Sequence, residues 1–266
     1  MKKLILSALA LVGMGAIATE TYAQFYVVKD GRVIFSLAEG TADYIAFENP
    51  NKIGTPVDLG LPSGTLWADH NIGAMNAHDA GSYYAWGEIT TKDVYNWSTY
   101  EWMDHSLDTW KGCTKYTFED GQTGGVWYDS EGKFIGDNKE ELEDVDDVAV
   151  QTWGAGWAMP THEQMQELVE KCEWEWTTLN EVPGYKVKSK AEGNDNSIFL
   201  PAAGYRRDSG TNYVGSYGHY WSRSLYSEGS DYAWGLYFYE GRVSMNSTDD
   251  RSRGLLVRPV LRSSEQ

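Results

Sequence analysis

Tyrosine, serine, glycine, asparagine, aspartate and arginine are concentrated near the C-terminus, between Tyr205 and Arg253. Most of them lie in GYRRDSGTNYVGSYGHYWSRSLYSEGSDY and YEGRVSMNSTDDRSRG. Rigid aromatic rings beside small polar side chains supply contact area at a low entropic cost, as in antibody paratopes. Aromatic rings also match the apolar faces of sugars. The pattern therefore predicts a ligand-binding surface made of loops and strand ends.

Six residues of this region are the candidate ligand-binding residues, because they stand beside glycines, in predicted loops or at strand ends. They are Tyr213, Tyr217, His219, Arg223, Tyr226 and Asn246. Trp221, Trp234 and Phe238 fall inside apolar strand patterns, so we expect these three to pack in the core. The ligand that such a surface favours is a glycan or a protein.

The sequence contains no recognised catalytic motif. H-E-x-x-H, C-x-x-C and G-x-S-x-G are absent, and DGQTGGVW lacks the lysine and hydroxyl residue of a phosphate-binding loop. No ligand spacing typical of a metal site relates the five histidines, which are His70, His78, His105, His162 and His219. We therefore predict a chain that is not an enzyme, with no catalytic residue, no cofactor and no metal.

An acidic run, DNKEELEDVDDVAVQTW, lies near the middle of the chain. Asp146 and Asp147 stand where a short helix could start, and carboxylates there complement the helix dipole. A calcium loop needs ligands at fixed offsets around a glycine, as in D-x-D-x-D-G, and the run lacks this pattern. Whether Asp144, Asp146 and Asp147 bind calcium stays open at the level of sequence.

The N-terminus, MKKLILSALALVGMGAIATETYAQ, predicts export. Two lysines precede an apolar run from Leu4 to Ala18, and a small-x-Ala cleavage site precedes Gln24. We predict a signal peptide over residues 1–23, a periplasmic, cell-surface or secreted location, and no membrane insertion after cleavage. The formal charge of −17 excludes nucleic acid as an expected partner, because a field of that sign repels phosphates.

The elements that position the candidate residues follow from local patterns. FYVVKDGRVIFSLA predicts a β-hairpin in a small unit over residues 24–52, before a main domain over 53–266. In WGAGWAMPTHEQMQEL, Thr161 and Gln164 form a capping box, and apolar residues then recur at helical spacing up to Cys172. We assign this segment a structural role. Cys172 and Cys113 could form a disulfide in an exported protein, or be buried free thiols.

Most other segments predict strands. They are TLWADHNIGA, GSYYAWGEIT, CEWEWTT, GYKVKSK, SIFLPAAGYR, HYWSRSLY, YAWGLYFYEGRVSM and GLLVRPVL. YAWGLYF is apolar or aromatic on both faces, which predicts a central strand covered on two sides. Residues 93–136 have no clean periodicity and predict a long ordered loop region with a small hairpin.

Seven motifs carry a resemblance to a known family. They are VDLGLPSGTLWADHNIGA, GSYYAWGE, WGAGWAMPTHEQMQEL, CEWEWTTLNEVPGYKVKS, NSIFLPAAGYR, YWSRS and VRPV, between about Val57 and Leu261. Together they resemble the Fibrobacter succinogenes major paralogous domain family, common on exported proteins of gut Bacteroidetes. The resemblance implies an α+β, C-type-lectin-like fold with mainly antiparallel strands and one or two short helices. The leading hairpin resembles the unit that often precedes such domains.

The resemblance implies no established activity, and the sequence departs from its active relatives. Formylglycine-generating enzymes of similar fold need a C-terminal pair of cysteines, whereas no cysteine follows Cys172. The Glu-Pro-Asn or Gln-Pro-Asp triplet of calcium-dependent lectins is absent, and Ala158 stands where the broader group usually has an arginine. The leading hypothesis is an exported, non-catalytic module for an extracellular glycan or protein ligand. The alternatives are a structural or surface-assembly component and a hypervariable ligand-display protein.

Overall fold

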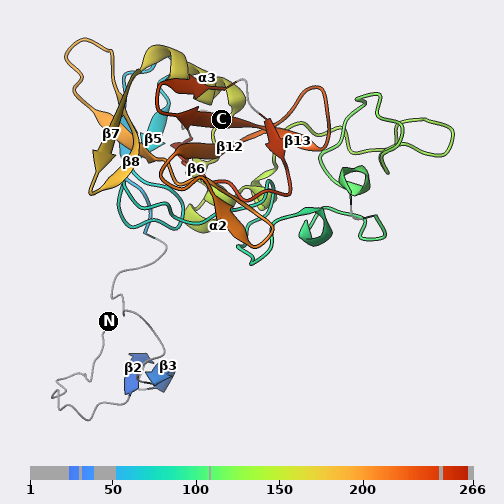
Figure 1. Ribbon diagram of the computed structural model, residues 1–266, viewed down its shortest axis with the longest axis horizontal. Helices are drawn as coiled ribbons and strands as arrows, with labels where there is room; N and C mark the ends of the chain where they lie inside the picture. Colours follow the sequence, from blue (N-terminus) through green and yellow to red (C-terminus); the bar gives the residue numbers. More distant parts are fainter. Residues whose placement is uncertain (1–23, 30–31, 39–51, 108, 246–247, 263–266) are drawn as a thin grey trace. The chain divides into compact units, whose positions relative to one another are not determined.

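The computed structural model describes residues 24–29, 32–38, 52–107, 109–245 and 248–262 (Figure 1). The chain divides into two units, residues 1–52 and 53–266. In the first unit, β2 (Gln24–Lys29) pairs antiparallel with β3 (Arg32–Ala38), as the hairpin pattern predicts. The predicted signal peptide lies outside the described residues. None of the described helices has the length and apolar character needed to cross a membrane.

The second unit consists of short antiparallel sheets, with two short α-helices in its described part, and so confirms the coarse α+β expectation. The helices are α2 (Val148–Trp153) and α3 (His162–Lys171). The strands are β4 (Pro56–Asp58), β5 (Leu66–Ala68), β6 (Trp157–Ala158), β7 (Glu173–Leu179), β8 (Val182–Lys188), β9 (Ser197–Pro201), β10 (Tyr205–Arg207), β11 (Gly210–Asn212), β12 (Tyr217–Leu225), β13 (Tyr232–Tyr239), β14 (Arg242–Ser244), β15 (Thr248–Asp250) and β16 (Val260–Leu261).

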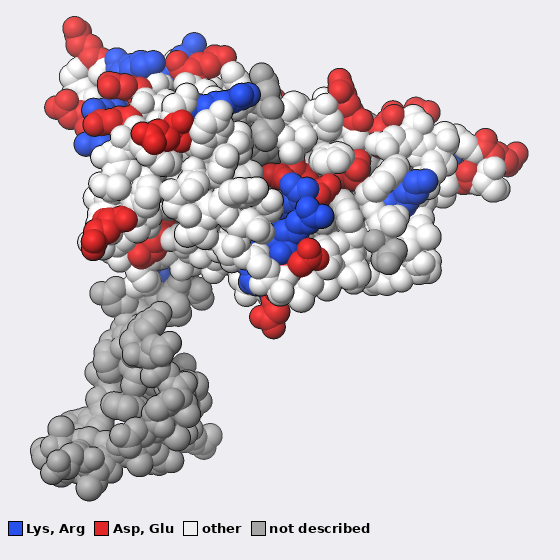
Figure 2. All heavy atoms as spheres, viewed as in Figure 1, with Lys and Arg blue, Asp and Glu red and all other residues white. Residues whose placement is uncertain are grey.

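Four sheets make up the described part of this unit. Their strand orders are β4-β5-β16-β6, β7-β8-β9, β10-β11 and β12-β13-β14, with β15 also paired to β13. In the first of these sheets Val260 lies opposite both Trp67 and Ala158, so β16 joins an early strand to a middle one. Residues 93–136 form the predicted loop region, with 3-10 turns at Trp97–Thr99 and Trp110–Gly112. At the end of the second unit that these loops form, the charged side chains in view are mostly acidic (Figures 1 and 2).

Helix α3 begins where the capping box predicts. The Thr161 hydroxyl accepts a hydrogen bond from the Gln164 backbone, and the Gln164 side chain accepts one from the Thr161 backbone at 2.9 Å. Met165 and Leu168 are fully buried, and Cys172, also buried, caps the C-terminal end of the helix. The helix packs against β12 and β13, so the prediction of an amphipathic helix docked on a sheet is confirmed.

Strands β12 and β13 divide the core from an outward face. Side chains alternate along a strand, and Tyr220, Leu236 and Phe238 belong to one core cluster. On the other face Tyr217 lies opposite Tyr239, and both tyrosines are only half-buried. Strand β13 is central in its sheet, as the YAWGLYF pattern predicts, but its outward face is only partly covered at Tyr237 and Tyr239. The burial predicted for Trp221 and Phe238 is confirmed, whereas Trp234 is only partly buried.

The predicted strand over residues 81–90 is absent. Tyr84 makes one isolated antiparallel bridge to Leu255, and the positive φ angles of Gly81 and Gly87, 77° and 79°, turn the chain on both sides of it. Trp86 is fully buried. The apolar character of this segment therefore reflects side-chain burial in a loop, not pairing in a sheet. In GLLVRPVL, too, only Val260–Leu261 is a strand.

Arg251 is fully buried and holds the loop region against the core. Its guanidinium donates to the Tyr100 hydroxyl at 3.0 Å and to the carbonyls of Ser230, Lys115 and Tyr116 at 2.6, 2.7 and 3.0 Å. No carboxylate contacts it within the described residues. Neutral oxygens therefore satisfy this buried charge, which is costly to bury unpaired.

Arg258 plays a similar part between two sheets. It donates to the Asn71 side chain at 2.8 Å and to the carbonyls of Ala68 and Phe199 at 3.2 and 2.8 Å. Burial lowers the pKa of its guanidinium to about 10. The group still carries its charge at neutral pH, so its hydrogen bonds link β9 to the end of β5 throughout the physiological range.

Cys113 and Cys172 are buried free thiols in separate clusters, which decides between the two readings that the sequence left open. Burial raises the pKa of each thiol to about 11. Because the thiolate is the reactive form, we expect neither cysteine to react with a chromogenic disulfide reagent in the folded protein, and both to react once guanidinium unfolds the chain. Fast reaction of the folded protein would contradict this burial, as would unfolded chains without two free thiols.

Candidate functional site

Five tyrosines lie together on the outward face of β12 and β13. We call them the tyrosine face: Tyr205, Tyr213, Tyr217, Tyr237 and Tyr239. Three stand on β12 and β13, one begins β10, and Tyr213 lies in the turn after β11. Tyr213 is 58% exposed and the other four are half-buried. Two of the five, Tyr213 and Tyr217, are among the candidates that the sequence indicated.

Tyr217 lies at the centre of this face. Its ring centroid lies 4.8 Å from that of Tyr213, 5.4 Å from that of Tyr239 and 5.7 Å from that of Tyr237. The ring is almost parallel to Tyr237, at 22°, and steeply inclined to Tyr213, at 66°. Mutual packing limits the rotation of each ring, so the face presents its rings in fixed positions.

His219 supports the tyrosine face from beneath. It is 8% exposed, and its ring lies 4.9 Å from Tyr205 and 5.0 Å from Tyr237. Its Nδ1 lies 3.1 Å from an Asp249 oxygen, and Asp249 also accepts a hydrogen bond from Arg253. This candidate residue is therefore placed to orient the tyrosines, because little of its own surface is left for a ligand.

The turn that carries Tyr213 is under backbone strain. Tyr213 has a φ of 60°, an uncommon angle for a residue with a side chain. Its carbonyl accepts hydrogen bonds from the backbone of Ser216 at 3.0 Å and of Tyr217 at 3.1 Å, which hold the turn closed. Strained residues that their surroundings fix in place are frequent at ligand-binding positions. An exposed aromatic ring in such a conformation makes this turn a candidate binding position.

The other candidate residues lie elsewhere. Arg223 stands near the opposite end of β12 from Tyr217. Tyr226 follows that strand, and its ring lies 4.8 Å from Trp234, which in turn lies 4.4 Å from His162. Asn246 is outside the described residues. The structure thus brings Tyr213, Tyr217 and His219 together and separates Arg223 and Tyr226 from them.

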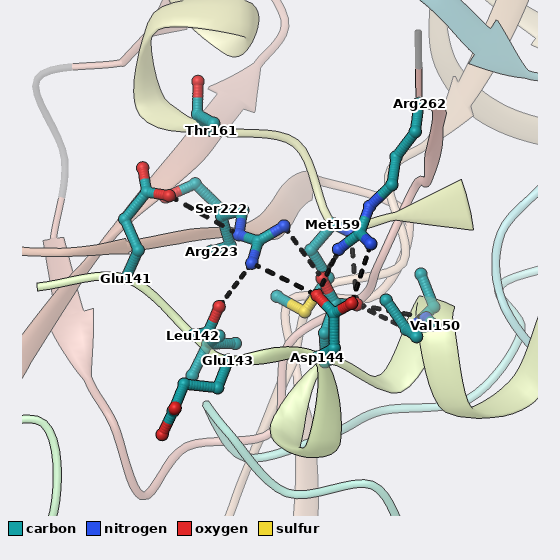
Figure 3. A network of polar contacts seen from close by, with 12 residues as sticks. Glu141, Leu142, Glu143, Asp144, Val150, Met159, Thr161, Ser222, Arg223 and Arg262 are labelled. Carbon is teal, nitrogen blue, oxygen red and sulfur yellow. Dashed lines mark hydrogen bonds and ion pairs between the residues drawn. The ribbon is translucent and has the colours of Figure 1, made fainter. Parts of the chain in front are cut away.

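Arg223 belongs to a polar network with the acidic run (Figure 3). Arg223 and Arg262 point toward Asp144 from two sides: Arg262 donates to both of its oxygens, and Arg223 approaches one of them to 3.9 Å. The hydrogen bond from Arg262 lowers the pKa of Asp144. Arg223 also lies 3.7 Å from Asp147, which is fully buried, and this burial raises the pKa of the Asp147 carboxyl.

The three aspartates of the acidic run face different partners. Asp147 caps α2 by accepting hydrogen bonds from the first turn of that helix, as the sequence predicts. Asp146 accepts hydrogen bonds from the side chains of Lys115 and Tyr116. Within the described residues, no three histidine, cysteine or acidic side chains are grouped to hold a metal ion. Contacts with other groups of the same chain thus account for the geometry of Asp144, Asp146 and Asp147.

Comparison with known proteins identifies one family model over part of this region. Residues 174–260 match a domain of unknown function, DUF8237. The matched range contains the whole tyrosine face and Arg223. No curated protein and no solved structure matches the chain.

Three members of the tyrosine face were not among the candidates. Tyr237 and Tyr239 alternate with Leu236 and Phe238, and this period of two was a usable signal that the two tyrosines share one face of β13. Tyr205 has no comparable signal. It joins the face because β10 pairs with β11, which brings it 6.0 Å from Tyr213.

Proposed function

We propose that this chain is an exported, non-catalytic binding module that holds an extracellular glycan or protein ligand on the tyrosine face. The observation that carries the proposal is the exposed ring of Tyr213, fixed at a positive φ and packed on Tyr217. An exposed ring in a strained conformation is unfavourable for folding alone, and a binding role accounts for it.

The chemistry of the face suits contact with a ligand that is partly apolar. Each tyrosine offers an apolar ring and a hydroxyl that donates and accepts hydrogen bonds. Burial raises the pKa of Tyr237, so its hydroxyl remains protonated and neutral at physiological pH. The rings are held by each other and by His219, and a ligand therefore loses little of its binding free energy to ordering them.

We further propose that residues 53–266 have a C-type-lectin-like fold. Support comes from the seven sequence motifs, from the antiparallel sheets with two short helices, and from the long loop region inserted before α2. In this proposal the tyrosine face occupies the C-terminal part of the domain, and the ligand contacts strand faces and one turn without a metal ion.

A binding array tests the function. The mature chain, residues 24–266, is applied to immobilised glycans, mucins and extracellular proteins, beside a Tyr213→Ala/Tyr217→Ala variant. We expect the double variant to lose affinity by about tenfold or more, because buried aromatic contacts dominate binding free energies. The matched control is Tyr232→Ala, which removes a half-buried tyrosine of β13 outside the face. A blank array for the unaltered chain would refute the proposal, and so would equal losses in the double variant and the control.

A further inference from the structure

Arg223 is partly buried, and it uses far fewer of its hydrogen-bond donors than the fully buried Arg251 and Arg258 do. Arg251 donates four hydrogen bonds and Arg258 three. The Arg223 side chain is only 15% exposed, yet within the described residues its guanidinium donates one, to the Leu142 carbonyl. Its Nε is buried and makes no hydrogen bond, and the nearest Glu141 carboxylate oxygen lies 3.6 Å away. Its Nη1 donates no hydrogen bond within the described residues and lies 3.7 Å from an Asp147 oxygen. Because donors in such a position are normally satisfied, Nη1 is the donor left for another acceptor.

A pocket of about 620 Å³ opens beside Arg223, between the first turn of α3 and the strands β5, β6 and β16. This volume is within the range of small-molecule sites. Apolar side chains of the three strands back the pocket, as expected for such a site. Its polar lining consists of Ser63, Thr65, Thr161, Gln164, Arg223 and Arg262.

The polar lining is held in position by its own hydrogen bonds. The Thr65 hydroxyl bonds the Ser63 hydroxyl at 2.7 Å and accepts from the Gln164 side chain at 3.3 Å. Gln164 in turn is fixed by the capping box of α3. The segment around α3, to which the sequence analysis gave a structural role, therefore also forms one wall of a pocket.

The charges around the pocket do not favour an anion. The two guanidinium groups of Arg223 and Arg262 stand among the carboxylates of Glu141, Asp144 and Asp147, at 3.6 to 3.9 Å from Arg223. Two positive and three negative groups leave no net positive charge. A hydroxyl group, by contrast, can accept from a guanidinium N–H while it donates to a side-chain oxygen. A lining of guanidinium, hydroxyl and amide groups over an apolar floor fits a ligand that is rich in hydroxyls and uncharged.

We propose that this pocket binds a neutral saccharide unit, with Arg223 donating to its hydroxyls and Thr65 and Gln164 positioned to bond its remaining polar groups. The pocket is distinct from the tyrosine face, because Arg223 and Tyr217 stand near opposite ends of β12. The proposal therefore does not depend on the function proposed for that face.

Saturation-transfer NMR of the mature chain tests the pocket. The probes are the methyl glycosides of glucose, galactose, mannose, xylose and N-acetylglucosamine, with glucuronate and inorganic phosphate as anions. We expect at least one neutral glycoside to bind and neither anion to do so. Arg223→Lys keeps the positive charge beside Asp147 but removes the planar set of donors, and we expect it to weaken binding by about tenfold. Ser63→Trp, at an exposed rim position, should abolish binding by filling the pocket.

Each result decides the proposal. Absence of binding by every neutral glycoside overturns it, as does tighter binding of either anion or a glycoside affinity that Ser63→Trp leaves unchanged. Because Arg223→Lys could disturb folding near Asp147, Ser63→Trp is the deciding variant if the lysine variant melts early. The Tyr213→Ala/Tyr217→Ala variant separates the two sites. If it alone loses the glycoside, the sugar binds at the tyrosine face and the assignment to the pocket is wrong.

Discussion

Arg251→Met is expected to lower the melting temperature of the protein by roughly 10 °C. Methionine fills much of the same space but leaves the carbonyls of Lys115, Tyr116 and Ser230 and the Tyr100 hydroxyl without their donor. A buried acceptor that loses its partner costs about 1 kcal/mol or more, so the four together cost about 4 kcal/mol of unfolding free energy. The loop region should detach first, because Arg251 is its central anchor.

Thermal denaturation followed by circular dichroism measures this effect. The control is Arg207→Met, which removes an exposed arginine whose ion pair with Asp208, at 3.9 Å, contributes little. A fall in melting temperature no larger than that of the control would show that the buried guanidinium is not needed. A large fall with faster proteolysis between residues 93 and 136 would also locate the first region to unfold.

Gly204→Ala is expected to cost about 3 kcal/mol of stability and to weaken ligand binding at the tyrosine face. Gly204 has a φ of 68°, and a Cβ added there would lie 1.9 Å from the Asn212 carbonyl oxygen. That oxygen is part of the backbone, so it cannot rotate away as a side chain could. Gly204 also donates a hydrogen bond to the Tyr217 carbonyl at 2.7 Å, so the strain acts directly on the turn that carries Tyr213.

Equilibrium unfolding in guanidinium chloride gives the stability change, and the glycan and protein array gives the change in binding. Gly210→Ala is the matched control, since Gly210 begins β11 in the hairpin that directly follows Gly204, and its added Cβ would meet only the Arg207 carbonyl oxygen, at 3.8 Å. If both alanine variants are equally stable, the close approach of Gly204 to Asn212 does not constrain the hairpin. Unchanged binding by Gly204→Ala would separate the turn from the ligand site.

Sequence patterns predicted the features that depend on neighbours in the chain. The capping box of Thr161 and Gln164 is local, and so is the cap that Asp147 provides to α2. The tyrosine face depends instead on register, because Tyr239 joins Tyr217 only through the pairing of β12 with β13. No local pattern contains that information. The set of candidate residues was therefore incomplete, and it also joined residues that stand far apart on one strand.

The partners of Arg223 were equally hidden. Its type and position near a strand end were visible in the sequence, but its network brings together the acidic run and Arg262, which are distant along the chain. The strand prediction for residues 81–90 was wrong for a related reason. Trp86 in this segment is buried by residues that are distant in the sequence. Its apolar pattern is therefore the same as that of a buried strand, although Tyr84 makes only an isolated bridge.

The position of β16 fixes when, during synthesis of the chain, its sheet can be completed. β5 and β6 are translated long before β16, yet Val260 pairs with both Trp67 and Ala158. Until residues 260 and 261 are available, β5 and β6 lack the strand that pairs with both, and the sheet cannot be completed. Pairing across such a sequence distance is slow, because the chain loses the entropy of closing a long loop before the strand contacts form. Under the export that we propose, this delay would leave the sheet incomplete while the chain crosses a translocation channel.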